Sequence, residues 1–143
     1  ACFTKMTKNS QKTFGFLAFN EMEELDFVGP YEIICTWSKH FGGPSNVPII
    51  GEHKIIKCGL GLKIETQYNL DNCPPLNYLL IPGGLGTYLQ QDNPKITQFI
   101  KSAYKDCEYI LTVCTASLLL AEIGLLNGKN ATTHWSFIDK LKS

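Results

Sequence analysis

Three short, largely apolar segments constrain the fold of this chain more than any other feature of its sequence. They are FGFLAF at residues 14–19, YLLI at residues 78–81 and YILTV at residues 109–113. Segments of this length and composition, bounded by polar or turn residues, are typical of strands buried on both faces of a parallel sheet. We therefore expect these three segments to form strands of such a sheet.

Segments with helical features lie between and after these strands. In LDFVGPYEIICTWSKHF, residues 25–41, Pro30 suits the first turn of a helix, and apolar residues recur at helical spacing. A second helix is expected after Asn93-Pro94, and a third from Thr115 to Leu126, ending at Gly128. Three further segments complete the assignment: a strand and small hairpin over 47–67, a short strand at 131–133, and a final helical turn in SFIDKLKS.

The alternation of strands and helices predicts an α/β fold in which helices cover both faces of a mainly parallel sheet. In sheets of this kind, ligands bind at the edge where the carboxyl ends of the strands meet. Residues at these ends are therefore the first candidates for a functional site.

Composition excludes several classes of protein and favours a reducing compartment. Thirteen basic side chains balance thirteen acidic ones, so the chain has no net charge that would favour binding to nucleic acid or to an anionic membrane. The apolar segments are much shorter than the roughly 18 residues of a membrane-spanning helix. The chain has six cysteines and no CxxC pair, which indicates buried thiols in the cytoplasm rather than a disulfide framework. Residues 1–13 are polar and are interpreted as a leader to one domain over residues 14–143.

Cys114 lies where the strand 109–113 passes directly into a helix, with no loop residues between them. A nucleophile at such a strand-to-helix elbow projects its side chain outward from a tight turn. The adjacent helix N-terminus favours an anion, so the expected species is a thiolate. From spacing alone, an inert buried cysteine is an equally good interpretation.

Two other segments converge on the same edge of the sheet. Asp26 follows the first strand, and the turn Pro82-Gly83-Gly84 follows the strand 78–81. Backbone N–H groups near Gly84 and Thr115 would face this space and stabilise developing negative charge. Taken alone, however, Asp26 reads as a helix N-cap, and the glycine pair reads as a simple turn.

Four linked motifs together resemble the ThiJ/PfpI superfamily, and most closely its isocyanide hydratase branch. The motifs are LDFVGPYEI, NCPPLNYLLIPGG, IPGGLGT and LTVCTASLLLAEIGLLNGKNATTHW, and the similarity extends from about Phe14 to the end of the chain. The resemblance implies a flavodoxin-like three-layer sandwich, usually a homodimer. Relatives continue beyond ATTHW with further strands and a helix, so we expect the C-terminal elements of the domain to be missing here.

The resemblance also implies a site with a cysteine nucleophile on the elbow and an acidic partner. Cys114 and Asp26 stand at those positions, with Thr115 after the cysteine. Many members of the superfamily have Glu at the position of Asp26 and His at the position of Thr115. The Asp and Thr found here agree with the hydratase branch. The implied reaction is hydration of an isocyanide to an N-substituted formamide: Cys114 attacks, Asp26 shuttles the proton, Thr115 positions it, and Gly83 and Gly84 contribute oxyanion or substrate contacts. No metal or cofactor is required, and the partner is a small-molecule substrate.

Three alternatives remain at this stage. The chain could be a glyoxalase-like or deglycase-like enzyme that acts on reactive carbonyls, or a non-catalytic redox sensor in which Cys114 is oxidised. It could also resemble the ligand-sensing half of an AraC-like regulator, although no basic helix-turn-helix segment accompanies it. His134 is assigned to packing at a strand end rather than to the catalytic set.

Overall fold

The computed structural model describes residues 11–143. Its central sheet has four parallel strands in the order β2-β1-β5-β6, and an antiparallel hairpin, β3-β4, stands apart from it. The strands of the described residues are Phe14–Ala18 (β1), Ile49–Gly51 (β2), Ile55–Lys57 (β3), Lys63–Glu65 (β4), Tyr78–Ile81 (β5) and Tyr109–Thr112 (β6). The expected parallel sheet and the hairpin within 47–67 are both confirmed.

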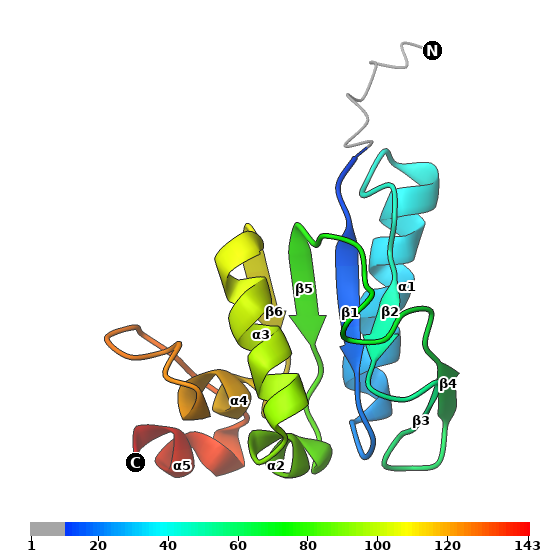
Figure 1. Ribbon diagram of the computed structural model, residues 1–143. Helices are drawn as coiled ribbons and strands as arrows, with labels where there is room; N and C mark the ends of the chain where they lie inside the picture. The colour runs from blue at the N-terminus through cyan, green and yellow to red at the C-terminus, as the bar shows by residue number, and fades with distance from the viewer. Residues whose placement is uncertain (1–10) are drawn as a thin grey trace.

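Helices cover both faces of this sheet, with α1 on one side and α3 on the other (Figure 1). The shorter helices gather beyond the carboxyl ends of the strands. The helices are Glu24–His40 (α1), Gly86–Gln91 (α2), Pro94–Asp106 (α3), Ala116–Glu122 (α4) and Ile138–Lys142 (α5), and Trp135–Phe137 forms a 3-10 turn. The α/β sandwich expected from the sequence is therefore confirmed.

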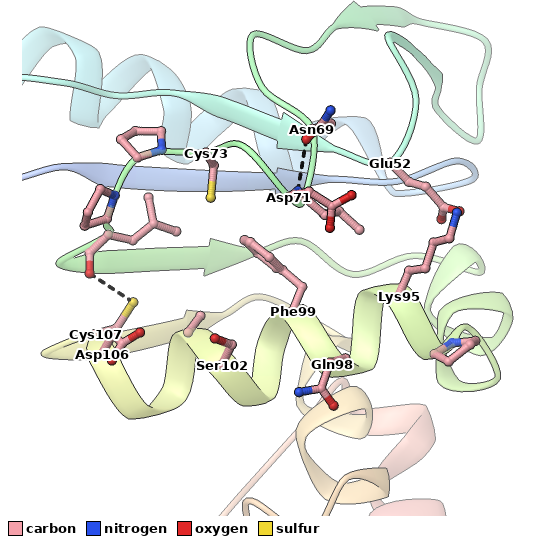
Figure 2. Close-up of a pocket in the computed structure, with 16 residues that line it drawn as sticks. Glu52, Asn69, Asp71, Cys73, Lys95, Gln98, Phe99, Ser102, Asp106 and Cys107 are labelled. Atoms are coloured by element: carbon pink, nitrogen blue, oxygen red, sulfur yellow. Dashed lines mark hydrogen bonds and ion pairs between the residues drawn. The ribbon is translucent and has the colours of Figure 1, made fainter.

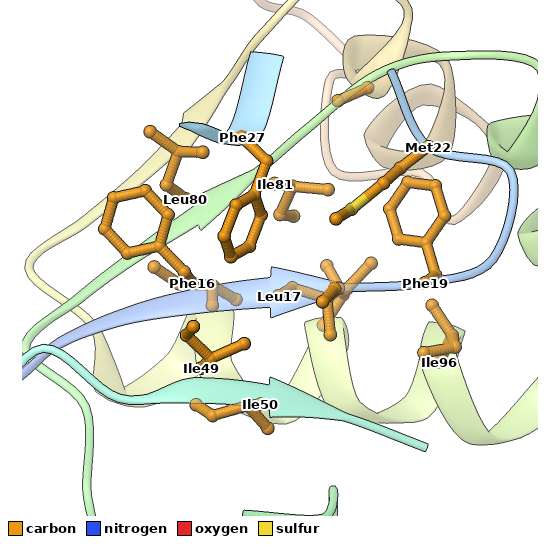
Figure 3. Close-up of a cluster of buried hydrophobic side chains, with 14 of the residues drawn as sticks. Phe16, Leu17, Phe19, Met22, Phe27, Ile49, Ile50, Leu80, Ile81 and Ile96 are labelled. Atoms are coloured by element: carbon orange, nitrogen blue, oxygen red, sulfur yellow. The ribbon is translucent and has the colours of Figure 1, made fainter. Parts of the chain in front are cut away.

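The core lies between the sheet and its two covering helices (Figure 3). Phe16 of β1 is fully buried, and its ring lies 5.5 Å from that of Phe27 and 5.3 Å from that of Tyr31, both on α1. On the opposite face, α3 buries Ile96 and Ile100 at the helical spacing of four residues. These contacts fix α1 over β1, and so fix the place of the acidic residue in its first turn.

Four parts of the expected secondary structure are wrong. Pro30 was expected in the first turn of a helix, but α1 begins at Glu24 and Pro30 lies inside it. Residues 131–133 form no strand, because they pair with no strand of residues 11–143; Thr133 instead donates its hydroxyl to the Cys114 carbonyl at 3.1 Å. The helix expected to reach Leu126 ends at Glu122, where Gly124 adopts a left-handed conformation with φ of 79°. The helix α2 was not expected at all, because GTYLQQ has no apolar periodicity.

The contacts of the domain extend back to Lys12, within the segment interpreted as a leader. The Lys12 ammonium group lies 2.8 Å from the Glu108 carboxylate, and Thr13 bridges to Asn46. Residues 1–10 of the expected leader lie outside the described part of the chain.

Candidate active site

Cys114 occupies the expected elbow between β6 and α4. Its φ of 55° places it in the left-handed region, which is rare for a residue with a side chain and is typical of a strained turn at a functional site. Val113 still donates to the Ile81 carbonyl at 3.1 Å, so the sheet pairing holds the chain up to the residue before the turn. The thiol is half-buried, and it is neither sealed in the core nor fully exposed.

Asp26 lies in the first turn of α1 and reaches across to this elbow. Its Oδ2 accepts a hydrogen bond from the Gly83 N–H at 3.2 Å, and its negative charge lies near enough to Cys114 to raise the pKa of that thiol. The N-cap of the helix is Glu23, which makes no side-chain capping bond. The interpretation of Asp26 as a simple N-cap is therefore wrong, because its carboxyl group instead accepts from the turn that packs against Cys114.

Gly83 and Gly84 bring the β5 turn against the elbow. A Cβ on Gly83 would lie 2.8 Å from both the Cys114 Cβ and the Thr115 nitrogen, so only glycine fits there. The Gly83 N–H donates to Asp26, and the Gly84 N–H donates to the Thr115 hydroxyl at 3.0 Å. A substrate oxygen would therefore have to compete with Asp26 and Thr115 for these two N–H groups. The expected oxyanion role of Gly83 and Gly84 would require the N–H groups to leave their present acceptors.

The electrostatics of the pair differ from the expected thiolate. The pKa of Cys114 is raised, first by burial and then by the negative charge of Asp26, against the lowering effect of hydrogen bonds from the Thr115 N–H and hydroxyl. The site therefore pairs a thiol whose pKa is raised with a nearby carboxyl group.

The pKa of Asp26 is also raised, because burial penalises its charged form more than its partners stabilise it. The hydrogen bonds from Gly83 and Cys114 and the charge of His134 act in the opposite direction. Asp26 also borders a mainly apolar hollow of about 510 Å³ between α1 and the sheet, lined in part by Leu80 and Val113. A carboxyl group with a raised pKa in such surroundings is suited to exchanging protons.

A family model confirms the resemblance that these residues suggested. The model for the DJ-1/PfpI family matches residues 12–143. The chain belongs to the DJ-1/PfpI family.

The similarity of this DJ-1/PfpI chain to individual proteins varies. It is 33% identical to isonitrile hydratase of Pseudomonas putida over 130 residues, which cover 89% of this chain and 54% of that protein. Deglycase PfpI of Pyrococcus furiosus is 21% identical over 128 residues, which cover 88% of this chain and 74% of that one. The crystal structure of a ThiJ/PfpI family protein from Pseudomonas syringae matches with a TM-score of 0.81 at 30% identity, covering 92% of this chain and 54% of that one. The chain thus spans about half the length of the isonitrile hydratase and of the Pseudomonas syringae protein.

Two residues that the sequence analysis did not place in the site lie beside it in this family member. Thr133 bonds the backbone of Cys114, and His134 is near enough for its charge to lower the pKa of Asp26. His134 also caps the 3-10 turn by accepting from the Ser136 N–H. The sequence analysis noted His134, but it expected a strand at 131–133 and therefore did not place these residues near the elbow.

A second hollow lies away from this site (Figure 2). It measures about 970 Å³, lies between α3 and the segment 69–76, and contains none of the five residues expected from the sequence to form the site. Phe99 projects into it from α3, with Cys73 on the opposite wall. No group of three or more metal-ligating side chains is present among residues 11–143. Within the same residues, no helix combines the length and hydropathy of a membrane span.

The close packing at Gly83 gives a first testable prediction. Gly83→Ala is expected to lower the free energy of unfolding by about 1–3 kcal/mol, because the new methyl group meets the rigid backbone of the elbow. Gly59→Ala is the matched control: its Cβ would be 3.5 Å from the nearest atom, and we expect a change within about 0.5 kcal/mol. Chemical denaturation measures both, and equal losses in the two variants would contradict the packing argument.

Proposed function

We propose that this protein hydrates an isocyanide to an N-substituted formamide, with Cys114 as the nucleophile. The observation that carries the proposal is the place of the Asp26 carboxyl group beside the elbow, where it accepts from the Gly83 N–H and lies near enough to Cys114 for its charge to raise the pKa of that thiol. The similarity to isonitrile hydratase supports the substrate class. Thr115 after the cysteine, and Asp rather than Glu as its partner, agree with that branch of the family.

The raised pKa of the thiol requires its proton to leave as the sulfur attacks. In the proposed first step, the Cys114 sulfur bonds to the terminal carbon of the isocyanide, and Asp26 takes the thiol proton. Asp26 then returns this proton to the same carbon, which gives a thioimidate, R–N=CH–S. The nitrogen keeps its substituent throughout, and the carboxylate is regenerated for the next step.

Water completes the reaction through the same carboxyl group. Asp26 accepts a proton from water as the hydroxyl group adds to the thioimidate carbon, and this proton passes to the nitrogen. The C–S bond then breaks, the carbonyl forms, and the hydroxyl proton returns to the sulfur through Asp26. The sum is one isocyanide and one water converted to one formamide, with thiol and carboxylate restored and no cofactor consumed.

The surrounding residues support these proton transfers. The Thr115 N–H and hydroxyl stabilise negative charge on the sulfur when the C–S bond breaks. Gly83 holds the Asp26 carboxyl group through its N–H, and Gly84 holds the Thr115 hydroxyl in the same way. We therefore propose that the two glycines act on the reaction mainly by positioning these groups, in addition to the substrate contacts expected of them.

The direct test is to incubate the purified chain with one aliphatic and one aryl isocyanide. We expect the N-substituted formamide to accumulate, as followed by chromatography and mass spectrometry. Methylglyoxal is supplied in a parallel reaction. Consumption of methylglyoxal without any formamide would overturn the hydratase proposal in favour of the deglycase-like alternative.

The redox-sensor alternative is less well supported by the site. The thiolate is the form that peroxide oxidises, and burial together with Asp26 raises the pKa of Cys114. The homodimer and the cytoplasmic location remain predictions from the resemblance and the composition. Leu25 and Ile33 on α1 are 74% and 68% exposed, and a second copy would cover such an apolar surface.

A further inference from the structure

The mainly apolar hollow between α1 and the sheet shares Asp26 with the candidate active site. It measures about 510 Å³, which is within the usual range for a small-molecule pocket. Of the residues between 11 and 143 that line it, Asp26 alone has a polar side chain. An apolar hollow with one acidic group at its border is typical of a site that binds an apolar group next to a reactive centre.

The α1 wall of this apolar hollow is one continuous stripe of the helix. The residues that form it recur every three or four positions, as expected of a single helix face. They are Leu25, Asp26, Gly29, Pro30, Ile33 and Ile34. From Asp26 to Ile33 the helix rises by about 10 Å, at roughly 1.5 Å per residue. The wall therefore leads from the acidic residue of the site along the length of α1.

The strands β5 and β6 supply the facing floor. Leu80 and Leu111 are paired directly across these strands, and Val113 follows two positions later on the same face. Val113 is also the residue immediately before Cys114. The floor and the α1 wall thus both reach the site, the floor at Val113 and the wall at Asp26.

The proposed reaction gives this apolar hollow a use. In its first step the isocyanide carbon lies between the Cys114 sulfur and the Asp26 carboxyl group. The C≡N–R group of an isocyanide is linear, so the substituent R extends away from the reacting carbon. The β5 turn closes one side of the elbow, because a Cβ on Gly83 would lie 2.8 Å from that of Cys114. We infer that the apolar hollow binds R and thereby selects isocyanides with an aliphatic or aryl substituent. This inference rests on the proposed function.

The first test compares kcat/KM for methyl, propyl and pentyl isocyanide. We expect kcat/KM to rise about three- to fourfold with each added methylene group, which corresponds to about 0.8 kcal/mol per buried CH₂. From methyl to pentyl the expected rise is on the order of 10²-fold. Equal values for the three substrates would overturn the inference, because they would show that the substituent remains in water.

Substitutions in the lining test where the substituent binds. Leu111→Asn places an amide of similar size on the floor, at a side chain that is 40% exposed. We expect the pentyl-to-methyl ratio of kcat/KM to fall roughly fivefold or more. Val28→Asn is the matched control: Val28 is 41% exposed and lies on α1 outside the apolar hollow, so the wild-type ratio should persist. Thermal melts check folding, and Ile33→Asn on the opposite wall replaces Leu111→Asn if that variant does not fold.

A binding measurement separates this inference from the hydration reaction. N-pentylformamide and N-methylformamide are added while iodoacetamide alkylates Cys114, and the modified peptide is measured by mass spectrometry. We expect N-pentylformamide to protect Cys114 at concentrations at least roughly tenfold lower, and Leu111→Asn to reduce this difference. Such protection without turnover of any isocyanide would support the apolar hollow and overturn the hydration reaction. Turnover with equal protection by the two formamides would do the reverse.

A second copy of the chain is the competing occupant of the apolar hollow. Sedimentation equilibrium of the wild type and of Leu111→Asn measures whether the floor holds two copies together. If Leu111→Asn dissociates a dimer while the pentyl-to-methyl ratio stays at the wild-type value, the second copy fills the space and the inference is wrong.

Discussion

Replacing Cys114 by alanine is expected to lower formamide formation from an isocyanide by roughly 10³-fold or more, because no covalent thioimidate can form. The loss should appear in kcat and not only in KM, since the missing atom makes the bond that divides the reaction into two steps. The fold should persist, because the side chain is half-buried and its removal leaves the sheet pairing at Val113 intact. Steady-state assays together with a thermal melt measure both quantities.

Cys107→Ala supplies the matched control for this prediction. Cys107 is also a half-buried free thiol, but it lies at the end of α3 beside the hollow between α3 and the segment 69–76. Burial raises its pKa to about 11. We expect turnover within about twofold of the wild type, because nothing links this thiol to the elbow. If the two alanine variants lost activity equally, or if the Cys114 variant kept its turnover, the nucleophile would have to be sought elsewhere.

The elbow and its acidic partner could be predicted because they follow from the periodicity and topology of the chain. A strand that passes into a helix with no loop leaves a tight turn, and parallel strands bring their carboxyl ends to one edge. These two rules were enough to bring Cys114, Asp26 and Gly83 together. In the structure, Gly83 donates to the Asp26 carboxyl group, and a Cβ on Gly83 would lie 2.8 Å from the Cβ of Cys114.

The features that the sequence did not predict depend on balances between distant groups. Burial and the charge of Asp26 raise the pKa of Cys114 against the lowering effect of Thr115, and no local pattern contains this balance. Thr87 was missed for a similar reason. Its fully buried side chain lies on α2, a six-residue helix without apolar periodicity, and its hydroxyl group donates to the Gly84 carbonyl of the β5 turn at 2.8 Å.

Asp26→Asn is expected to move reactivity and catalysis in opposite directions. The Asp26 carboxylate raises the pKa of Cys114, so its replacement by a neutral amide should lower that pKa and accelerate alkylation at neutral pH. Turnover should nevertheless fall by about 10²- to 10⁴-fold, because the amide cannot carry the proton from sulfur to carbon. Alkylation rates and formamide assays at the same pH measure the two effects side by side.

Glu23→Gln separates the charge of Asp26 from its role as a proton carrier. Glu23 also raises the pKa of Cys114, although its effect is smaller than those of burial, Asp26 and Thr115. Its neutral variant should therefore alkylate slightly faster than the wild type while it retains turnover. If only Asp26→Asn combines a more readily ionised thiol with slower reaction of the isocyanide, the Asp26 carboxyl group is the proton carrier. If turnover rose together with alkylation in Asp26→Asn, the carboxylate would only oppose ionisation, and the proton would have to travel by another route.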